Sequence, residues 1–454
     1  MFTYLRENYD ERNIDVNKIK ELIEKHREVS TEMKKKKDYY LGNHEITERK
    51  LLEKVEGPDN KVIINHAKDI TDTATGYFLG SPIKYTTTAD TDIEKLIDAF
   101  SKAGTDENDY DNALDMSIYG VAYEYIYAKE DSTELDLKSL EPENTFIVYD
   151  DSIEQKPLFA VYYYTRYDEE SKEKYYHADI FTKNYIYEFL INGDKVTKSS
   201  PKPHFMGDIP VIEYQNNKYR IGDFEQQMSL VDAYNKVMST RVNDKEQFVD
   251  AILALYGVRL GENIEKTKEA ITLLKEDKLL ELPADARAEY IVRTLDETGA
   301  ETLKQSIKQD IYSISHVPNL TDENFSGNSS GVALEMKLIG LEMLTKTKER
   351  YFRKALKKRL EIFCIRLGFN DILNDIEFIT PKFSRGLPKN LLELSQIVAN
   401  LKGIVSSEQL LSLLPFVEDP KSEIEKVLEE NQQRIQEYQF MMSNSELEDE
   451  EDQE

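Results

Sequence analysis

HVPNLTDENFSGNSSG, at His316 to Gly331, passes directly into VALEMKLIGLEMLTKTKERYFRKALKKRLEIFCIRL, at Val332 to Leu367. The first part is rich in Pro, Asn, Asp and Gly, the residues of turns and of backbone with positive φ. The second part has no Pro and a single Gly, Gly340, among strong helix formers. Its apolar residues recur at mostly helical spacing: Leu334, Leu338, Leu341, Leu344, Phe352, Leu356, Leu360, Phe363 and Leu367. The stretch predicts a polar loop seated on one very long helix, which is more typical of a machine part than of a small-molecule enzyme.

The chain beyond this helix is expected to be helical and to end in an acidic tail. Pro381 to Pro388 predicts a linker, because proline interrupts regular structure. Three short helices are expected after it, at Leu391 to Leu401, Ser407 to Leu414 and Lys421 to Tyr438. The final SELEDEEDQE is too charged to bury an apolar core, so we expect residues 441–454 to be disordered.

Before the loop, the sequence predicts helices and then strands. Residues 1–55 read as helical and charged, and helices are expected at Val16 to Lys37, Asn65 to Leu79, Ile93 to Ala103 and Tyr110 to Tyr119. From Gly120 to Tyr214 the period changes to two, as in VAYEYIYA and YIYEFLING, and Asn192-Gly193 marks a hairpin turn. This antiparallel region beside many helices makes the fold class α+β.

A small α/β insert is predicted between two helices. The flanking helices are expected at Asp223 to Phe248 and Thr298 to Ser315. Between them, Ala251 to Leu260 and Glu289 to Leu295 are strand-like, and Asn263 to Leu282 contains a charged helix.

The composition describes an acidic chain with room for several domains. The 454 residues allow two to four domains, and 59 basic against 87 acidic residues give a net charge of −28. This balance argues against a simple nucleic-acid-binding protein, which carries a basic surface. An acidic surface repels phosphate, so the excess of acidic residues fits a protein that lets nucleic acid pass without binding it tightly. A need for solubility alone also explains the excess.

The chain shows no sign of secretion or of a membrane span. The single cysteine, Cys364, lies on the apolar side of the long helix, has no disulfide partner, and fits a reducing cytoplasm. MFTYLRENYDERN lacks the apolar region of a signal peptide. No run approaches the roughly 18 apolar residues that a membrane span needs.

Catalytic and cofactor motifs find little support. SGNSSG lacks the Lys of a phosphate-binding loop, and DENDYD at Asp106 to Asp111 lacks the Gly of a calcium loop. The six His have neither zinc-site spacing nor a Cys partner, and no nucleophile elbow is present. A two-metal nuclease would need converging carboxylates, which counting alone cannot test. We therefore expect no enzyme, cofactor or metal, and we expect His316 to cap the end of a helix.

Basic residues cluster on the long helix of this acidic chain. They are Lys346, Lys348, Arg350, Arg353, Lys354, Lys357, Lys358 and Arg359. Such residues either pair with acidic neighbours, within the helix or between subunits, or they contact nucleic acid. Pairing is the favoured interpretation, because an acidic assembly needs cations at its own interfaces.

Several separated pieces of the sequence, in their order, resemble one family. They are YYLGNH at Tyr39 to His44, NHAKDITDTATGYFLGSPIKY at Asn65 to Tyr85, LVDAYNKVMSTRVND at Leu230 to Asp244, VPNLTDENFSGNSSGVALEMKL at Val317 to Leu338, and GIVSSEQLLSLLPFVEDPKSEIEKV at Gly403 to Val427. The chain resembles the portal proteins of tailed double-stranded-DNA bacteriophages, in the branch typical of siphoviruses of Gram-positive hosts.

The resemblance implies a portal fold with a wing, a stem, a clip and a crown. The implied parts are the wing at 1–225, stem helix 1 at 226–248, the clip at 249–297, stem helix 2 at 298–316, the tunnel loop at 317–330, the long helix and wing return at 331–384, the crown at 385–440 and the acidic tail at 441–454.

The resemblance also implies an assembly and its partners. The family forms a ring, usually of twelve subunits, at one capsid vertex of the virion, and assembles in the cytoplasm of the bacterial host. Double-stranded DNA passes through the ring without sequence specificity. The other implied partners are the terminase large subunit, the head-tail adaptor protein, and the major capsid and scaffolding proteins.

A channel that passes DNA quickly should hold it weakly, and each Lys or Arg contact strengthens phosphate binding. Val317 to Gly331 contains neither Lys nor Arg. The channel-facing residues expected in the tunnel loop are Asn319, Thr321, Asp322, Glu323, Asn324, Phe325 and Asn328. On stem helix 1, Lys236, Arg241 and Lys245 are candidates for sparse positive rings, with intersubunit pairing as the equal alternative.

Three functions remain distinguishable. The first is a non-enzymatic portal, the head-tail connector that serves as a channel for DNA packaging and ejection. The second is a ring-forming virion adaptor without a stem and tunnel loop. The third is a DNA-processing enzyme such as a nuclease.

Overall fold

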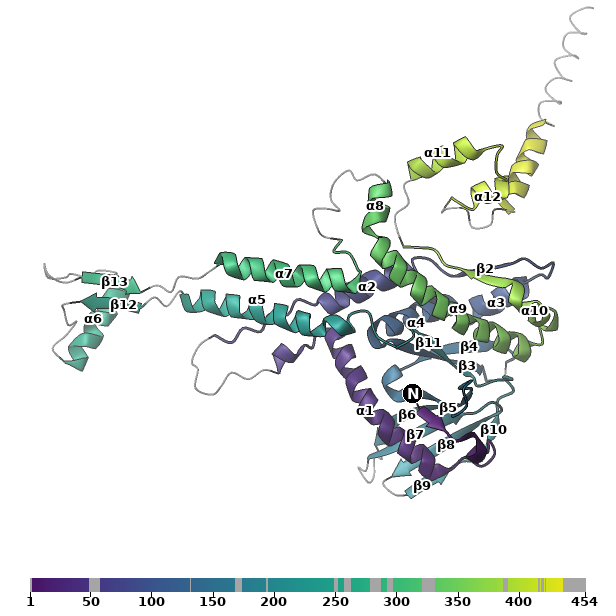
Figure 1. Ribbon diagram of the computed structural model, residues 1–454, viewed down its shortest axis with the longest axis horizontal. Helices are drawn as coiled ribbons and strands as arrows, with labels where there is room; N and C mark the ends of the chain where they lie inside the picture. The colour runs from purple at the N-terminus through teal and green to yellow at the C-terminus, as the bar shows by residue number, and fades with distance from the viewer. Residues whose placement is uncertain are drawn as a thin grey trace, which may run out of the picture. The chain divides into compact units, whose positions relative to one another are not determined.

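The computed structural model describes residues 2–48, 58–130, 132–167, 174–192, 195–248, 252–256, 263–277, 287–291, 297–320, 331–386, 391–414, 417, 420 and 422–435. The chain divides into two compact units. The first, the body with its stem, contains Met1–Asn328 and Ala333–Gly386, and the second contains Ser329–Val332 and Leu387–Glu454. Helices and antiparallel sheets are both present, which confirms the α+β class (Figure 1).

A seven-stranded sheet forms the first layer of the body, in the order β1-β5-β6-β7-β8-β10, with β9 paired to β8. Its strands are β1 (Phe2–Tyr4), β5 (Thr145–Asp150), β6 (Pro157–Tyr167), β7 (Lys174–Phe181), β8 (Tyr185–Asn192), β9 (Lys195–Lys198) and β10 (Lys202–Pro203). The hairpin predicted at Asn192 is confirmed, because Asn192 pairs with Lys195; Gly193 lies outside the described residues. The helical interpretation of residues 1–55 is wrong at Phe2–Tyr4, which pairs in parallel with β5.

One face of the large sheet is covered by helix α1 (Val16–Leu41). Asp15 caps the start of α1 by accepting from the Asn17 N–H, and Gly42, at φ 90°, ends it. The apolar stripe that includes Ile19, Leu22 and Ile23 packs on the alternating inward residues of the strands. The predicted end at Lys37 is one turn early, because Asp38 to Leu41 continue the helix.

A three-stranded sheet, β11-β3-β4, forms the second layer. Its strands are β3 (Val121–Ala128), β4 (Leu135–Leu140) and β11 (Val211–Gln215). Alternate residues divide between its two faces, so Tyr123 and Val211 pack toward the large sheet while Ala122 and Ile212 face helices. Those helices include α4 (Thr105–Tyr119) and α9 (Ile339–Leu367), which therefore share a core with this sheet.

The helices that surround the small sheet are α2 (His66–Phe78), α3 (Glu94–Lys102) and α4 (Thr105–Tyr119). They confirm the predicted elements, except that α4 begins five residues before the predicted Tyr110. The apolar pattern does not predict helix at residues 105–109, because two of them, Asn108 and Asp109, are buried polar groups that break the pattern.

Two chain segments far apart in sequence form a two-stranded sheet. Strand β2 (Lys84–Thr87) pairs antiparallel with β14 (Ile379–Lys382), which follows the short helix α10 (Asn370–Asn374). The linker predicted from Pro381 is therefore wrong at its start, because Pro381 lies inside β14. Proline is tolerated there because β14 has a partner on one side only.

The long helix is divided in two. Helix α8 (Gly331–Lys337) and helix α9 (Ile339–Leu367) are separated by Leu338, so the expectation of one unbroken helix is corrected at that position. Leu338 is buried, and its N–H is shared between the carbonyls of Leu334 and Glu335. This tight turn lies two residues before Gly340, the helix-weakening residue of the segment.

Helices α5 (Met228–Phe248) and α7 (Glu297–Ser315) run side by side, and we call this pair of helices the stem (Figure 1). Between them lie β12 (Ile252–Tyr256), α6 (Ile264–Asp277) and β13 (Arg287–Ile291), with β12 antiparallel to β13. The predicted α/β insert between two helices is confirmed.

The second unit is helical. It contains α11 (Leu391–Leu401), α12 (Ser407–Leu411) and helical residues at 422–435. Helix α12 ends earlier than the predicted Leu414, while the Ser406 hydroxyl caps its start by accepting from the Gln409 N–H. The predicted tail at 441–454 lies outside the described residues.

Candidate functional site

The predicted channel cations of α5 are placed against α7 of the same chain. Arg241 reaches two carboxylates one helical turn apart, with Nε 2.9 Å from Glu297 and Nη1 2.6 Å from Glu301. Lys245 Nζ lies 3.3 Å from Glu297. Hydrogen bonds from Lys304 and then Arg241 lower the pKa of Glu301 to about 2. Arg241 and Lys245 therefore cross-link the stem hairpin within one subunit.

Lys236 is placed differently. It is exposed and has no salt bridge among the described residues. It borders a cavity of about 300 Å³ between α5 and α7, whose walls include Val237, Ala300 and Leu303. Of the three stem candidates, Lys236 is the one whose charge is not matched by an ion-pair partner on α7.

A strap of extended chain, residues 58–65, is hydrogen-bonded along α5. The N–H groups of Asn60, Val62 and Ile64 donate to the side chains of Asn243, Ser239 and Asn235, at 2.8, 2.9 and 2.9 Å. Every second strap residue meets every fourth helix residue. Four helical residues rise about 6.0 Å and two extended residues about 6.6 Å, so the two repeats match closely.

Helix α5 is tied to α1 and to the turn after it by a second set of polar contacts. Tyr39 Oη donates to Asp232 at 2.6 Å, and Asn235 Nδ2 lies 2.8 Å from His44 Nδ1. The other half of the stem, α7, is joined to α2, where Tyr312 Oη donates to Asp69 at 2.6 Å and lies 3.2 Å from His66 Nδ1. Both stem helices are thus fixed to the body at their bases.

The first end of the predicted tunnel loop is anchored where α7 ends. His316 has φ 60°, the left-handed conformation of a residue that terminates a helix, which confirms its predicted role. Val317 is buried, and its N–H donates to the Ser315 hydroxyl at 3.2 Å. Asn319 is partly buried and Leu320 is exposed. The remaining predicted loop residues, Thr321, Asp322, Glu323, Asn324, Phe325 and Asn328, lie outside the described residues.

Gly340 explains how α9 meets the end of α7. A Cβ at Gly340 would lie 3.3 Å from the His316 carbonyl oxygen and 3.4 Å from its Cβ. The helix therefore accepts a glycine where His316 passes close to its backbone. This contact fixes α9 next to the point where the loop leaves α7.

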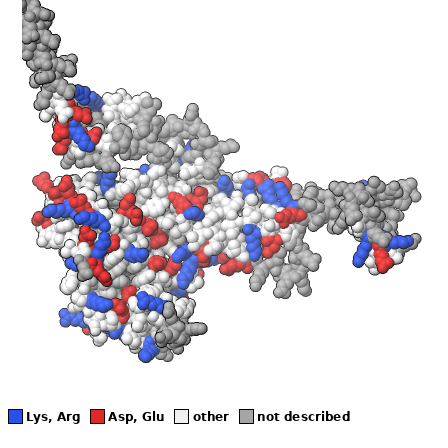
Figure 2. Space-filling view, turned by 180° about the vertical axis from the view of Figure 1, so that it is seen from behind, with Lys and Arg blue, Asp and Glu red and all other residues white. Residues whose placement is uncertain are grey.

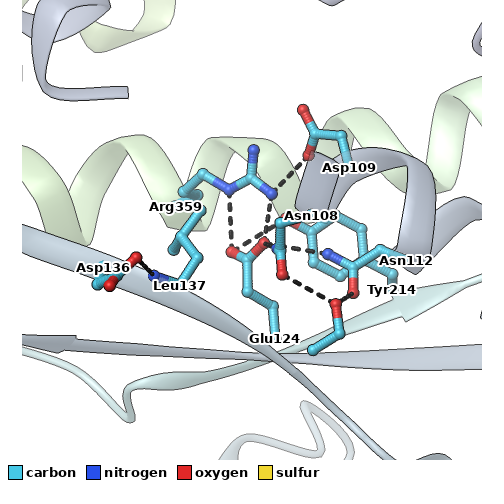
Figure 3. Close-up of polar contacts among 9 residues, drawn as sticks. Asn108, Asp109, Asn112, Glu124, Asp136, Leu137, Tyr214 and Arg359 are labelled. Atoms are coloured by element: carbon cyan, nitrogen blue, oxygen red, sulfur yellow. Dashed lines mark hydrogen bonds and ion pairs between the residues drawn. The ribbon is translucent and has the colours of Figure 1, made fainter. Parts of the chain in front are cut away.

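Two cations on α9 are fully buried and hold it to the body. The Arg359 guanidinium donates through Nε to Glu124 at 2.9 Å and through Nη2 to Glu124 and, at 2.5 Å, to Asp109 (Figure 3). Asn108 and Asn112 also donate to Glu124. Burial raises the pKa of Asp109 to about 6, against the lowering effect of Arg359.

Lys348 lies eleven residues before Arg359, three turns along the same face of α9. Its Nζ pairs with Asp223, just before α5, and donates to the Ser117 hydroxyl of α4 at 2.6 Å. Asn216 Nδ2 donates to the same Asp223 at 2.9 Å. This buried node connects α9, the base of α5 and α4.

The predicted pairing of the α9 cations with acidic residues is largely confirmed within the chain. Besides Lys348 and Arg359, the pairs are Lys346–Glu342, Arg353–Glu349, Lys357–Glu377 and Lys358–Asp208. Figure 2 shows acidic and basic side chains intermixed over the described surface of the body. Arg350 and Lys354 have no salt bridge among the described residues.

The sequence reasoning missed the strap ladder and the Lys348 node. Asn235, Ser239 and Asn243 recur every four residues, so a polar stripe could be found within LVDAYNKVMSTRVND. The partner of Lys348 could not be found, because Asp223 is one of 87 acidic residues. Across the described part of the chain there is neither a cluster suited to a metal ion nor a helix that could cross a membrane.

Comparison with known proteins identifies the family. The phage portal protein family described as SPP1 Gp6-like matches residues 19–437. The portal protein of Bacillus phage SPP1 is 24% identical over 426 residues, which cover 88% of this chain and 81% of the relative. The portal protein of Clostridium phage phiCD119 is 24% identical over 446 residues, covering 92% of this chain and 96% of the relative.

Among solved structures, the neck of an empty GTA particle, with C6 symmetry, aligns with a TM-score of 0.46 at 14% identity. This alignment covers 77% of this chain and 90% of the neck chain. Because the family match spans most of the sequence, the chain belongs to the phage portal proteins of the SPP1 Gp6-like family.

Proposed function

We propose that this chain is the subunit of a ring at one vertex of a phage capsid, and that the ring is the channel for DNA packaging and ejection. The family match supports the assembly and its place in the virion. The number of subunits, twelve by the resemblance, is part of the proposal. So are the docking of the terminase large subunit and the head-tail adaptor at the clip, and contacts with major capsid and scaffolding proteins.

The observation that carries the proposal is how the first end of the loop between α7 and α8 is held. Its first end is fixed by buried Val317 and by the contact of His316 with Gly340. Helix α9 is in turn fixed by two buried cations, Lys348 and Arg359. The loop is thus carried by a rigid support while its own sequence, from Val317 to Gly331, has no Lys or Arg.

A loop of this composition suits passage of DNA. Counterion release makes each Lys or Arg contact with phosphate strengthen binding, so a cation-free collar holds DNA weakly. Asn319, Thr321, Asn324 and Asn328 can exchange hydrogen bonds with phosphate oxygens, while Asp322 and Glu323 repel them. Among the stem cations, Lys236 is the proposed channel-facing charge, since Arg241 and Lys245 are matched by Glu297 and Glu301.

The test adds charge to the loop. We expect Asn324→Lys with Asn328→Lys to leave rings intact in negative-stain images and to lower the yield of DNA-filled heads at least ten-fold. Asn370→Lys with Asn374→Lys, on exposed positions of α10, adds the same charge elsewhere and should package normally.

The alternatives give different outcomes. Rings that package DNA equally well with the charged loop would indicate an adaptor and overturn the channel role of the loop. A monodisperse monomer at every salt concentration would overturn the ring. Metal-dependent cleavage of plasmid DNA by the pure protein would indicate a DNA-processing enzyme.

A further inference from the structure

One face of α8 and α9 is exposed along most of its length. Within α9, at about 100° per residue, the exposed residues from Ile339 to Lys354 lie roughly 140–220° around the helix from Arg359, and Arg350 is opposite Arg359. We call this face the outer stripe; its members are Met336, Ile339, Met343, Lys346, Arg350 and Lys354. Met336, Ile339 and Met343 are 67%, 58% and 67% exposed, so the stripe is apolar at its start and basic at its end.

The basic end of the outer stripe is not neutralised by its own chain. Arg353 and Lys357 pair with Glu349 and Glu377, but no described residue forms a salt bridge with Arg350 or Lys354. Lys346 is 63% exposed and lies 3.6 Å from Glu342. In a chain of net charge −28, exposed unmatched cations on one helix face are suited to an acidic partner.

An acidic groove lies on another surface of the same body. Its volume is about 540 Å³, and it is lined by Leu79, Gly80, Ser81 and Pro82, which follow α2, and by Asp106, Glu107, Tyr110 and Asp111 of α4. No salt bridge to its three carboxylates exists among the described residues. Partial burial and repulsion from Glu107 raise the pKa of Asp111, and Tyr110 is 42% exposed.

The outer stripe and the acidic groove face away from each other. Asp109 of α4 points toward α9, where it bonds Arg359, and Glu107 and Asp111 lie about 160° around α4 from Asp109. Arg350 in turn points away from the Arg359 contact.

One copy of the chain therefore cannot join its own stripe to its own groove, but two copies can. A contact between two different patches of identical subunits is a head-to-tail contact, the kind that closes into a ring. Both patches combine charge with apolar surface, the stripe through Met343 and the groove through Tyr110, Leu79 and Pro82. This complementarity points to a second copy as the occupant of each surface.

We propose that the outer stripe of one subunit docks on the acidic groove of the next, with Arg350 and Lys354 against Glu107 and Asp111, and Met343 against Tyr110. The inference rests on the proposed ring and assigns its contact surfaces. Because these charges lie at a solvent-accessible rim, the contact contributes to specificity and to the salt sensitivity of assembly.

Charge reversal and rescue test the contact. We expect Arg350→Glu with Lys354→Glu to lower the fraction of protein in rings at least ten-fold, measured by sedimentation velocity and negative-stain images at about 0.1 M salt, where charges still interact over roughly 10 Å. The matched control, Lys183→Glu with Lys195→Glu, makes the same change of charge at exposed positions in the β7–β8 turn and at the start of β9, and should assemble normally. Adding Glu107→Lys with Asp111→Lys to the first variant should restore rings.

Cross-linking provides a test that does not depend on loss of assembly. Arg350→Cys with Glu107→Cys, treated with a short bismaleimide, should give a ladder of linked subunits, whereas either substitution alone should give none. Cys364 will not react, because burial raises the pKa of its thiol to about 11.

The outcomes separate this inference from the proposed function. If wild-type protein forms rings and the Arg350→Glu, Lys354→Glu variant forms them equally well, the proposed contact is overturned and the ring remains. The same holds if the double-cysteine variant forms rings but gives no ladder of linked subunits. Wild-type protein that never forms rings would overturn the proposed function itself.

Discussion

The body and the stem of this chain use ion pairs in opposite settings. In the body, Arg359 and Lys348 are withdrawn from water and joined to carboxylates of other elements. In the stem, Arg241 and Lys245 bridge α5 and α7 at the surface. The buried pairs of the body fix the arrangement of its helices. The surface pairs of the stem contribute little to the packing of α5 on α7, because water screens them.

The largest expected effect is in the body. Arg359→Met should lower the free energy of unfolding by about 3–5 kcal/mol, because Glu124 and Asp109 would remain buried without their cation. Urea denaturation followed by circular dichroism measures the change. Adding Glu124→Gln and Asp109→Asn should recover part of the lost free energy of unfolding. A loss below about 1 kcal/mol for Arg359→Met alone would mean that the buried ion pairs stabilise the body no more than surface pairs do.

The second effect is a pH dependence located in the body. His26 is buried against Phe146 with Nδ1 3.0 Å from Tyr163 Oη, and burial lowers its pKa to about 4. The unfolded chain, with a pKa near 6.5, binds the extra proton more readily, so stability is full above pH 6.5 and falls as the pH drops toward 4. We expect a loss of about 2–3 kcal/mol over that window.

The check is a series of urea midpoints between pH 7 and 4 for wild type and His26→Phe. Phenylalanine fits the aromatic setting but cannot titrate, so this contribution to the slope should disappear. An unchanged slope in the variant would assign the acid sensitivity to other groups.

The third effect is at the junction of body and stem. Gly340→Ala gains helix propensity of about 1 kcal/mol but forces a Cβ to 3.3 Å from the His316 carbonyl, so we expect no net gain. Gly76→Ala is the matched control, because a Cβ at Gly76 of α2 meets nothing within 4 Å. Thermal unfolding should show the Gly76 variant about 1 kcal/mol more stable than the Gly340 variant, and equal stability would contradict the close contact.

The smallest effect is in the stem. Arg241→Gln should change the urea midpoint only slightly, because the ion pairs are at the surface and Lys245 and Lys304 still pair with Glu297 and Glu301. Hydrogen exchange of α7 amides should rise only slightly. A loss comparable to that of Arg359→Met would remove the distinction between the two regions.

The sequence predicted those features that local patterns encode. Apolar spacing located most helices, period-two alternation located the large sheet, and the helix-ending role of His316 followed from its place before a polar loop. The break at Leu338 was missed because the apolar residues keep helical spacing on both sides of it. β1 was missed because three residues are too few to show a period.

The candidate site was predicted less completely than the fold. Composition indicated the cation-free loop, but pairing decided which stem cations keep an unmatched charge, and pairing is tertiary. Arg241 looks equivalent to Lys236 in sequence, yet Glu297 and Glu301, about sixty positions later, pair with Arg241 and not with Lys236. Charge counts therefore give the sign of a surface, while neighbours decide which charges it displays.

The strap along α5 has a built-in limit of length. Its rungs at Asn60, Val62 and Ile64 advance by about 6.6 Å each, whereas Asn243, Ser239 and Asn235 advance by about 6.0 Å, so the two scales drift apart by roughly 0.6 Å per rung. Over three rungs the drift, about 1.2 Å, is shared among hydrogen bonds that stay near 2.9 Å. Two further hydrogen bonds would double this mismatch, so an extended chain can pair with a straight helix in this way over a short length only. That length limits where the segment before α2 can begin.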